Sequence, residues 1–281
     1  MGLTIRFLGT SAARPIPRWG CTCPQCTAAR SDPRARRTRS AILVNGSLLV
    51  DAGPDIYAQL ARLPYQDLSQ IDHVVLTHPH ADHFLGLDDL ASLRRISALN
   101  TLPIYALADG WDRIWDVFRY LIAAEVSEYD RRPFARRELV LGQSLSVADG
   151  LSVTPLDTHH TQPFTTAGLL IEQGDRRVVY APDFYDLPVD RIAGADLLIL
   201  DGAFLARERM DGRYRPQLEE GQGRHRPMLE SVEWAAQIGA GRILFTHFGH
   251  IGRSPEQLDA LLPAGFDLAY DGQVVTLETK S

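Results

Sequence analysis

Apolar residues recur along the chain in short runs that predict β-strands separated by turns and helices. The opening run LTIRFLGT predicts a first strand, and AILVNGSLLV predicts a hairpin because Asn45-Gly46 favours a tight turn. Further β-rich runs are HVVLT, LPIYAL, LSVTPL, AGLLIE, RVVYA, DLLIL and RILFT. A final strand pair is expected at FDLAY and QVVTLE, with Asp271-Gly272 between them.

Apolar residues with helical spacing lie between these runs, at residues 56–63, 87–98 and most clearly 111–122. Strands that alternate with helices, but also follow one another as hairpins, favour an α/β (α+β) chain with mixed sheets over a purely parallel one. No internal repeat or low-complexity stretch divides the chain, so one domain over residues 1–281 is the simplest organisation.

Residues 107–140 are a candidate helical insertion or lid within that domain. Trp111, Trp115 and Phe118 share one helical face there, a pattern typical of core packing. A dimer contact, giving a homodimer, or a cover over the functional site are the alternatives. An arginine-rich tail follows at Arg131, Arg132, Arg136 and Arg137; it is either solvated or directed at a substrate phosphate.

Composition narrows the classes of function. The chain has 281 residues, of which 45% are hydrophobic and 23% charged, as expected of a chain that buries a sizeable core. The net charge of −6 disfavours nucleic acid as a partner. No apolar stretch has the length of a membrane span or of a signal peptide, so a cytoplasmic protein without a membrane partner is expected.

The segment HVVLTHPHADHFLG carries the strongest chemical signal. His78 and His80 follow a predicted strand two residues apart, so their side chains point the same way and can share one ion. Asp82 and His83 come one short turn later, at the entry to a helix, and face the same space from another side. Imidazole and carboxylate ligands suit zinc, manganese and iron.

Three later apolar runs end in the same way. LSVTPLDTHH ends with His159 and His160, RVVYAPD with Asp183, and RILFTHFGH with His247 followed by His250. Ligands at the ends of neighbouring strands converge on one edge of a sheet. A lone histidine in such a place is more often structural, but this repetition predicts a metal site. The choice between His159 and His160 stays open at this point.

Three cysteines lie within six residues, in the segment WGCTCPQC. An odd and tightly spaced set is a poor disulfide framework and a better metal cluster. Cys21, Cys23 and Cys26 are one ligand short of a tetrahedral site, and His250 is the natural fourth, which gives a closed structural zinc site. The alternative is three buried or reactive thiols that are merely close in sequence.

HPHADH resembles the H-x-H-x-D-H motif of the metallo-β-lactamase superfamily, and the preceding SLLVDAG and the later His, Asp and His match its other motifs in order. The resemblance implies an αββα sandwich of two mixed sheets flanked by helices. It implies one ion held by His78, His80 and His160, another by Asp82, His83 and His247, and Asp183 between them. Asp51 would support the ligand loop from behind. His160 is chosen over His159 because the family's histidine precedes a small hydroxyl residue, here Thr161.

Two adjacent ions can hold a bridging hydroxide that attacks phosphorus or an activated carbonyl, with Asp183 as ligand and, alternatively, proton acceptor. The segments WGC-x-CPxC, HPHADH and THFGH together resemble the phosphodiesterases of phosphonate breakdown, the PhnP type. That resemblance implies a small phosphorylated substrate, 5-phosphoribosyl 1,2-cyclic phosphate or a related 2′,3′-cyclic nucleotide. It also implies catalytic manganese, zinc or iron, and it maps His225 to a residue that contacts phosphate or protonates the leaving oxygen. A polar cap on the next helix is the alternative for His225.

Two other functions compete with this one. A metallo-β-lactamase-fold hydrolase could act on another phosphodiester or on a thioester, although a thioesterase would not explain the cysteines. A non-catalytic carrier similar to PqqB, of pyrroloquinoline quinone biosynthesis, has a similar cysteine cluster but is expected to have incomplete catalytic ligands. The complete ligand set of this chain favours an enzyme, a metal-dependent phosphoric diester hydrolase.

Overall fold

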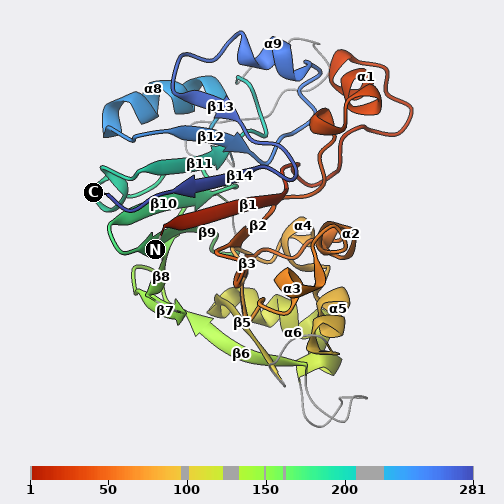
Figure 1. Ribbon diagram of the computed structural model, residues 1–281, viewed down its shortest axis with the longest axis vertical. Coiled ribbons are helices and arrows are strands. Elements are labelled where there is room, and N and C mark those ends of the chain that lie inside the picture. The colour runs from red at the N-terminus through yellow and green to blue at the C-terminus, as the bar shows by residue number, and fades with distance from the viewer. Residues whose placement is uncertain are drawn as a thin grey trace.

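Two seven-stranded β-sheets face each other in the computed structural model, with helices on their outer faces (Figure 1). This is the αββα sandwich expected from the sequence. The structure describes residues 2–95, 101–122, 133–148, 150–160, 163–206 and 225–280.

The first sheet has the strand order β14-β1-β2-β3-β4-β5-β6. Neighbouring strands are antiparallel from β14 to β3 and parallel from β3 to β6. The β2–β3 hairpin turns at Asn45 and Gly46, whose φ angles of 49° and 75° explain the Asn-Gly pair. The strands are β1 (Leu3–Gly9), β2 (Ala41–Val44), β3 (Leu48–Val50), β4 (His73–Val75), β5 (Leu102–Leu107), β6 (Phe134–Leu139) and β14 (Val274–Leu277).

The second sheet has the order β13-β12-β11-β10-β9-β8-β7. It repeats the plan of the first sheet, antiparallel from β7 to β10 and parallel from β10 to β13. The strands are β7 (Leu145–Ala148), β8 (Leu151–Asp157), β9 (Ala167–Gln173), β10 (Arg176–Ala181), β11 (Leu197–Asp201), β12 (Ile243–Thr246) and β13 (Phe266–Leu268).

The expected pairing of the last two strands is wrong. β13 pairs with β12 in the second sheet, whereas β14 pairs with β1 in the first. Gly272, with φ 90°, lies where the chain passes from one sheet to the other. A turn signal between two apolar runs fixes the turn, but it does not tell whether both runs join the same sheet.

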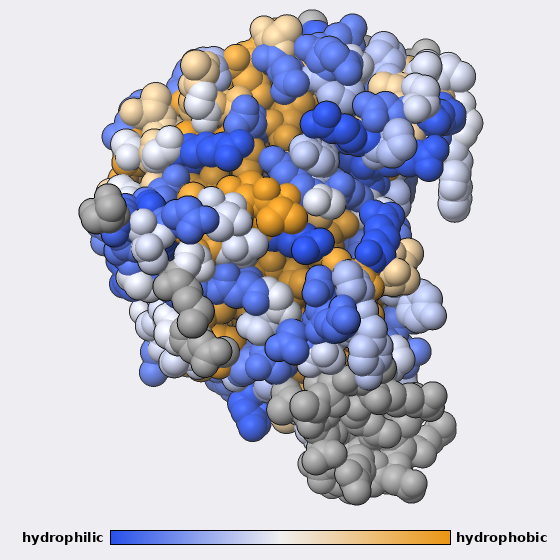
Figure 2. Space-filling model, viewed as in Figure 1, coloured by the Kyte–Doolittle hydropathy of each residue, from blue (hydrophilic) through white to orange (hydrophobic). Residues whose placement is uncertain are grey.

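Three apolar clusters hold the layers together. The central cluster fills the space between the sheets, and two others lie under the outer helices. Figure 2 shows apolar patches in the middle and upper part of one face of the molecule, bordered by polar residues. The helices of the first sheet are α2 (Ile56–Leu60), α3 (Tyr65–Leu68), α4 (Ala81–Phe84), α5 (Leu87–Leu90), η2 (Ala91–Arg95) and α6 (Ala108–Ile122). Those of the second are α1 (Pro24–Ser31), η1 (Pro33–Ala35), α7 (Val189–Ile192), α8 (Met228–Ile238) and α9 (Pro255–Asp259).

The described part of segment 107–140 belongs to this framework. Strand β6 pairs with β5 at the edge of the first sheet, and α6 packs on the outer face of that sheet. Trp111 is fully buried, and its indole Nε1 donates to the carbonyl oxygen of Arg137 at 2.8 Å. Phe118 is also buried, while Trp115 is about one-third exposed at 36%. These contacts are those of core packing.

The arginine-rich tail is described only in part, because Arg131 and Arg132 lie outside the described residues. Arg136 pairs with Glu138 at 3.8 Å and lies over the Trp111 ring. Arg136 and Arg137 both belong to strand β6. Within the described residues, no helix is both long enough and apolar enough to cross a lipid bilayer.

Candidate metal centre

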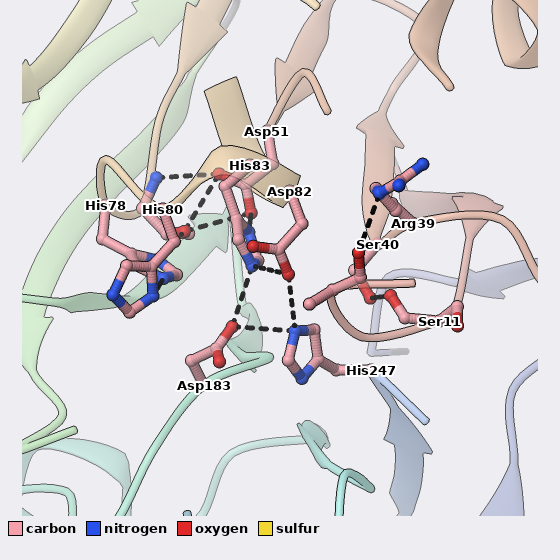
Figure 3. A network of polar contacts seen from close by, with 12 residues as sticks. Ser11, Arg39, Ser40, Asp51, His78, His80, Asp82, His83, Asp183 and His247 are labelled. Carbon is pink, nitrogen blue, oxygen red and sulfur yellow. Dashed lines mark hydrogen bonds and ion pairs between the residues drawn. The ribbon is translucent and has the colours of Figure 1, made fainter. Parts of the chain in front are cut away.

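The loop between β4 and α4 carries the H-x-H-x-D-H residues. Strand β4 ends at Val75, and His78 and His80 follow before α4 begins at Ala81. Asp82 and His83 lie in the first turn of α4. The side chains of the loop and of the helix thus point toward one another and form one polar cluster (Figure 3). His78, Asp82 and His83 are buried, and His80 is partly exposed.

The second sheet supplies the other side chains. His160 follows β8, Asp183 follows β10 and His247 follows β12, all buried. His247 has φ 54°, in the left-handed region that non-glycine residues rarely adopt. Asp51 and His159, with φ 65° and 50°, share this feature beside the same cluster. Backbone strain of this kind is typical of functional sites.

The seven residues form overlapping groups of potential ligands. His78, His80 and His160 make one group, and Asp82, His83 and His247 make another, each with ligand atoms within 4.8 Å of one another. Asp183 lies between them. Its Oδ2 is 3.0 Å from His83 Nε2 and 3.2 Å from His247 Nε2, and its Oδ1 is 3.6 Å from His160 Nε2. One carboxylate thus faces both groups.

The arrangement of the His and Asp side chains fits the binding of divalent metal ions better than a network of hydrogen bonds among these side chains. Among the described residues, the buried atoms His83 Nε2 and Asp183 Oδ2 have no aligned hydrogen-bond partner, although they are only 3.0 Å apart. Atoms that approach closely without the alignment of a hydrogen bond are expected where several donors surround an ion. Imidazole nitrogens with carboxylate oxygens are a suitable set for zinc, manganese or iron.

The electrostatics of the cluster are strongly coupled. Burial opposes the charged form of His247, but Asp183 and other carboxylates outweigh it and raise the pKa to about 10. His83 behaves alike: burial opposes its charge, and Asp51 and its neighbours raise the pKa well above the usual value. Burial, helped by the charge of His83, instead lowers the pKa of His78. A bound ion would replace the protons that His83 and His247 hold at neutral pH.

Of the two adjacent histidines, the structure places His160 in the cluster. His160 is buried beside His78 and His80, with ring centroids 5.7 and 5.5 Å away. The side chain of His159 is 64% exposed and lies 4.0 Å from Asp157. Thr161, the basis of the sequence choice, lies outside the described residues.

Two fully buried carboxylates support the ligands from behind. Asp51 accepts from His83 Nδ1 at 2.8 Å and from the backbone N–H of Thr77 at 2.8 Å, so it fixes both the ring and the loop. This is the supporting place that the family resemblance implied for Asp51. Such partners fix the tautomer and orientation of a ligating histidine.

Asp201 is the second buried carboxylate, and the sequence did not point to it. It accepts from His225 Nδ1 at 2.5 Å and lies 3.5 Å from His247 Nδ1, at the end of β11. Burial opposes the charge on His225, but Asp201 outweighs it and raises the histidine pKa. The signal was available, because Asp201 ends the run LLIL as Asp51 ends SLLV.

His225 itself lies at the edge of the cluster. Its ring centroid is 4.5 Å from that of His160 and 5.3 Å from that of Phe204, and its side chain is 19% exposed. Among the described contacts, Asp201 engages Nδ1, so Nε2 remains for a ligand. A residue that only capped the next helix would not need this buried partner.

The cysteine cluster forms a separate site. The Sγ atoms of Cys21, Cys23 and Cys26 lie 3.3, 3.2 and 3.5 Å from Nε2 of His250. The four atoms lie within 4.8 Å of one another, and the cysteines form no disulfide. Three sulfurs and one imidazole are a closed tetrahedral donor set for zinc. His250 is three residues from His247, so this site adjoins the other.

The sequence profile of the beta-lactamase superfamily domain matches residues 47–248, which include the His/Asp cluster. The chain belongs to the metallo-β-lactamase superfamily. The fold and the order of the ligands agree with that membership. Proteins of this fold bind metal ions at such a cluster, and a hydrolase is the activity that the family and its neighbours support.

Two solved structures are similar to this metallo-β-lactamase-fold protein over nearly its whole chain. A diphosphatase from the PhnP family has a TM-score of 0.79 and 27% identity, over 99% of this chain and 98% of that one. Zinc-bound PqqB from Methylobacterium extorquens has a TM-score of 0.77 and 26% identity, over 97% and 99%. By sequence, coenzyme PQQ synthesis protein B of Methylobacterium radiotolerans is 30% identical over 98% of this chain and its own full length.

Proposed function

We propose that this protein is a metal-dependent phosphoric diester hydrolase for a small cyclic phosphate, 5-phosphoribosyl 1,2-cyclic phosphate or a related 2′,3′-cyclic nucleotide. The observation that carries the proposal is the convergence of seven His and Asp side chains from both sheets into adjoining ligand groups. The similarity to a PhnP-family diphosphatase supports phosphorus as the reacting centre.

The residues assigned to metal binding fall into the two groups described above and the separate cysteine site. His78, His80 and His160 would hold one ion, Asp82, His83 and His247 a second, and Asp183 would face both. When bound, manganese, zinc or iron ions supply Lewis acidity and a water of lowered pKa. Cys21, Cys23, Cys26 and His250 would hold a structural zinc.

The protein's own groups then position and protonate the substrate. His225, with Nδ1 held by Asp201 and its ring centroid 4.5 Å from that of His160, would donate a proton from Nε2 to the departing oxygen. Phe204 lies against the His225 ring and forms an apolar wall next to it. Asp183 acts first as a ligand, because three histidines lie within 3.6 Å of its oxygens.

A second candidate is a non-catalytic role like that considered for PqqB. The 30% identity to coenzyme PQQ synthesis protein B over nearly the whole chain favours it. The complete ligand set and the Asp201–His225 pair favour an enzyme instead, because a carrier needs neither. Another phosphodiester or a thioester is the remaining alternative, and a homodimer remains a prediction.

Phosphorus NMR of the manganese- or zinc-loaded protein tests the proposal. The substrates are 5-phosphoribosyl 1,2-cyclic phosphate, adenosine 2′,3′-cyclic phosphate and bis(p-nitrophenyl) phosphate. Selective opening of a cyclic compound supports the proposal. Cleavage of the linear diester alone moves the protein to another phosphodiesterase class. No turnover of any compound with metal bound favours the carrier role.

The matched control is Asp82→Ala. This change removes one ligand from the second group, so turnover should fall by at least about 10³-fold while the fold is retained. Circular dichroism and metal analysis check that folding and the structural zinc survive. An Asp82→Ala protein with normal turnover would rule out the assigned metal centre.

A further inference from the structure

One arginine joins two of the segments that meet at the metal centre, and no step of the proposed mechanism uses it. Arg226 directly follows His225, the candidate proton donor, and lies two residues before α8 begins at Met228. Its side chain reaches the loop after β10, the loop that carries Asp183. Arg226 is therefore in a place from which it can hold His225 relative to the metal ligands.

Arg226 binds three consecutive residues of that loop. Its backbone N–H donates to the carbonyl oxygen of Phe184 at 2.8 Å. Its Nε donates to the carbonyl oxygen of Tyr185 at 2.8 Å, and its Nη2 donates to the carboxylate of Asp186 at 3.1 Å. The guanidinium carbon also lies 5.7 and 5.3 Å from the ring centroids of Tyr185 and Trp234, within the range of cation–π contacts. A planar fork held at this many points has one orientation.

The loop that Arg226 binds is itself fixed, so it can serve as an anchor. The backbone N–H groups of Tyr185 and Asp186 both donate to the carbonyl oxygen of Thr158, at 2.9 and 3.1 Å. Thr158 is fully buried and lies two residues before His160. Arg226 therefore attaches its own segment to a loop that is already held beside a metal ligand.

The role assigned to His225 needs such an anchor. Its Nδ1 donates to Asp201 at 2.5 Å and lies 3.8 Å from Asp183 Oδ1. The bond to Asp201 orients the ring, whereas the contacts of Arg226 fix the backbone at the next residue. A proton donor acts only within hydrogen-bond reach of the departing oxygen, and a displacement of about 1 Å can reduce a rate about 10²-fold.

We propose that Arg226 is a positioning residue for His225, which it holds at the distance from the metal centre that proton donation requires. This inference rests on the proposed function, in which His225 protonates the departing oxygen. An arginine that only stabilised the loop of Asp183 would affect metal binding and every reaction of the centre alike. A positioning residue for the proton donor affects only the reactions that need the proton.

The kinetic test uses two substrates with different leaving groups. Opening of adenosine 2′,3′-cyclic phosphate expels an alkoxide, which needs a proton, whereas bis(p-nitrophenyl) phosphate expels p-nitrophenolate, which leaves as a stable anion. Arg226→Gln should lower kcat for the cyclic compound by about tenfold or more, a part of the factor of about 10²–10⁴ typical of a general acid. It should change kcat for the linear diester, and KM for both, by less than about twofold. In a His225→Gln background the same change should have no further effect on the cyclic compound.

Arg242→Gln is the matched control. Arg242 also pairs with a carboxylate of the second sheet, that of Asp267 at 2.9 Å, but it lies before β12, at the opposite end of that strand from His247. Both rates should stay unchanged in this variant. An equal fall for both substrates in Arg226→Gln, with loss of metal, would overturn the proposal, and so would two unchanged rates.

A second variant keeps the test usable if Arg226→Gln does not fold. Asp186→Asn removes only the partner whose side chain is 51% exposed, and it leaves the contact with Tyr185 in place. It should lower kcat for the cyclic compound about two- to fivefold, as expected for one exposed ion pair, without affecting the linear diester. Equal rates of Asp186→Asn and wild type for the cyclic compound would then overturn the proposal.

Proton NMR of the zinc-loaded protein gives a test that needs no turnover. The short hydrogen bond from His225 Nδ1 to Asp201 should give a resonance downfield of the backbone amides, identified by its absence in His225→Gln. In Arg226→Gln this resonance should broaden through exchange with solvent, whereas Arg242→Gln should keep it sharp. An unchanged line width in Arg226→Gln would overturn the proposal. If no cyclic compound is hydrolysed, the proposed function fails, and this resonance alone decides whether Arg226 positions His225.

Discussion

At the scale of single residues, two buried carboxylates orient the histidines of the cluster by hydrogen bonds and ion pairs to their Nδ1 atoms. Asp51 fixes His83, and Asp201 reaches both His225 and His247, with each carboxylate fully buried. A buried charge is costly unless it is paired, and both carboxylates are paired with histidines of the cluster. Asp201 thus connects a candidate proton donor to a candidate metal ligand.

Asp201→Asn tests this role. The amide keeps the shape but no longer favours the protonated Nδ1 of His225, so turnover of the cyclic phosphate should fall about 10–100-fold. The limb of the pH–rate profile that reports the acid should move to lower pH, because the raised pKa of His225 depends on Asp201. A fall in rate with an unchanged pH profile would mean that Asp201 is merely structural.

The pKa of His247 predicts how metal removal affects stability. A group with a pKa near 10 in the folded protein and near 6.5 when unfolded stabilises the fold below pH 6.5 and loses this effect as the pH rises to 10. Metal-free protein should therefore lose unfolding free energy between pH 6.5 and 10 in urea titrations. His247→Gln should flatten this decline, and metal-loaded protein should lack it, because an ion takes the place of the proton.

Sequence reasoning at this scale found ligands but not their partners. His78, His80, Asp82 and His83 stand out because four such residues within six positions are rare outside a metal site. A single Asp at the end of an apolar run, such as Asp201, also occurs where a strand meets solvent. Only the packing of β11 against the segment of His225 distinguishes the two cases.

At the scale of elements, helix α6 supports one of the ligand groups. Asp109, in its first turn, accepts from the backbone N–H of Thr165 at 2.6 Å, in the loop that follows His160. Gly110 lies next to the ring of Pro79, between His78 and His80, because a Cβ there would be 3.7 Å from Pro79 Cδ. The helix therefore braces both loops that supply the His78, His80 and His160 group.

Asp109→Ala should weaken this group selectively. Metal affinity of the His78, His80 and His160 site should fall about tenfold, while the other ion and the zinc are retained. Titration with cobalt, followed by absorption and metal analysis, separates the sites. Asp112→Ala, at an exposed position on the same helix, is the control. Equal affinity in both variants would show that α6 does not position the site.

Elements were largely predictable, but their assignment to sheets was not. Turn residues marked the β2–β3 hairpin and the helical spacing of apolar residues marked α6, since these signals are local. β6 and β7 were missed, as β6 has the charged residues Arg136, Arg137 and Glu138 in its middle. Charged edge strands resist aggregation, and this same property weakens the pattern by which a strand is recognised.

At the scale of the whole molecule, the N-terminal loop is tied to the far end of the chain. Cys21, Cys23 and Cys26 meet His250, and the N–H of Phe248 bonds the carbonyl of Thr10 at 2.8 Å. A closed metal site contributes its binding energy to folding. The cysteine site therefore stabilises the connection between the loop after β1 and the segment after β12, which carries His247.

Cys23→Ser should lower stability before it lowers turnover. The protein should lose about one equivalent of zinc and melt at least about 5 °C lower, measured by metal analysis and calorimetry. Thr22→Ala, an exposed neighbour in the same loop, should change neither quantity. A Cys23→Ser protein with full zinc content and an unchanged melting temperature would contradict the assignment of a structural zinc site to the cysteines.

The division of ligands between the sheets also bears on how the chain matures. His78 to His83 belong to the first half of the sequence, whereas Asp183 and His247 follow strands of the second sheet and come 100 and 164 residues after His83. The complete ligand set therefore forms only after the second sheet has been synthesised, and chains released before His247 would carry the first motif without becoming competent metalloproteins.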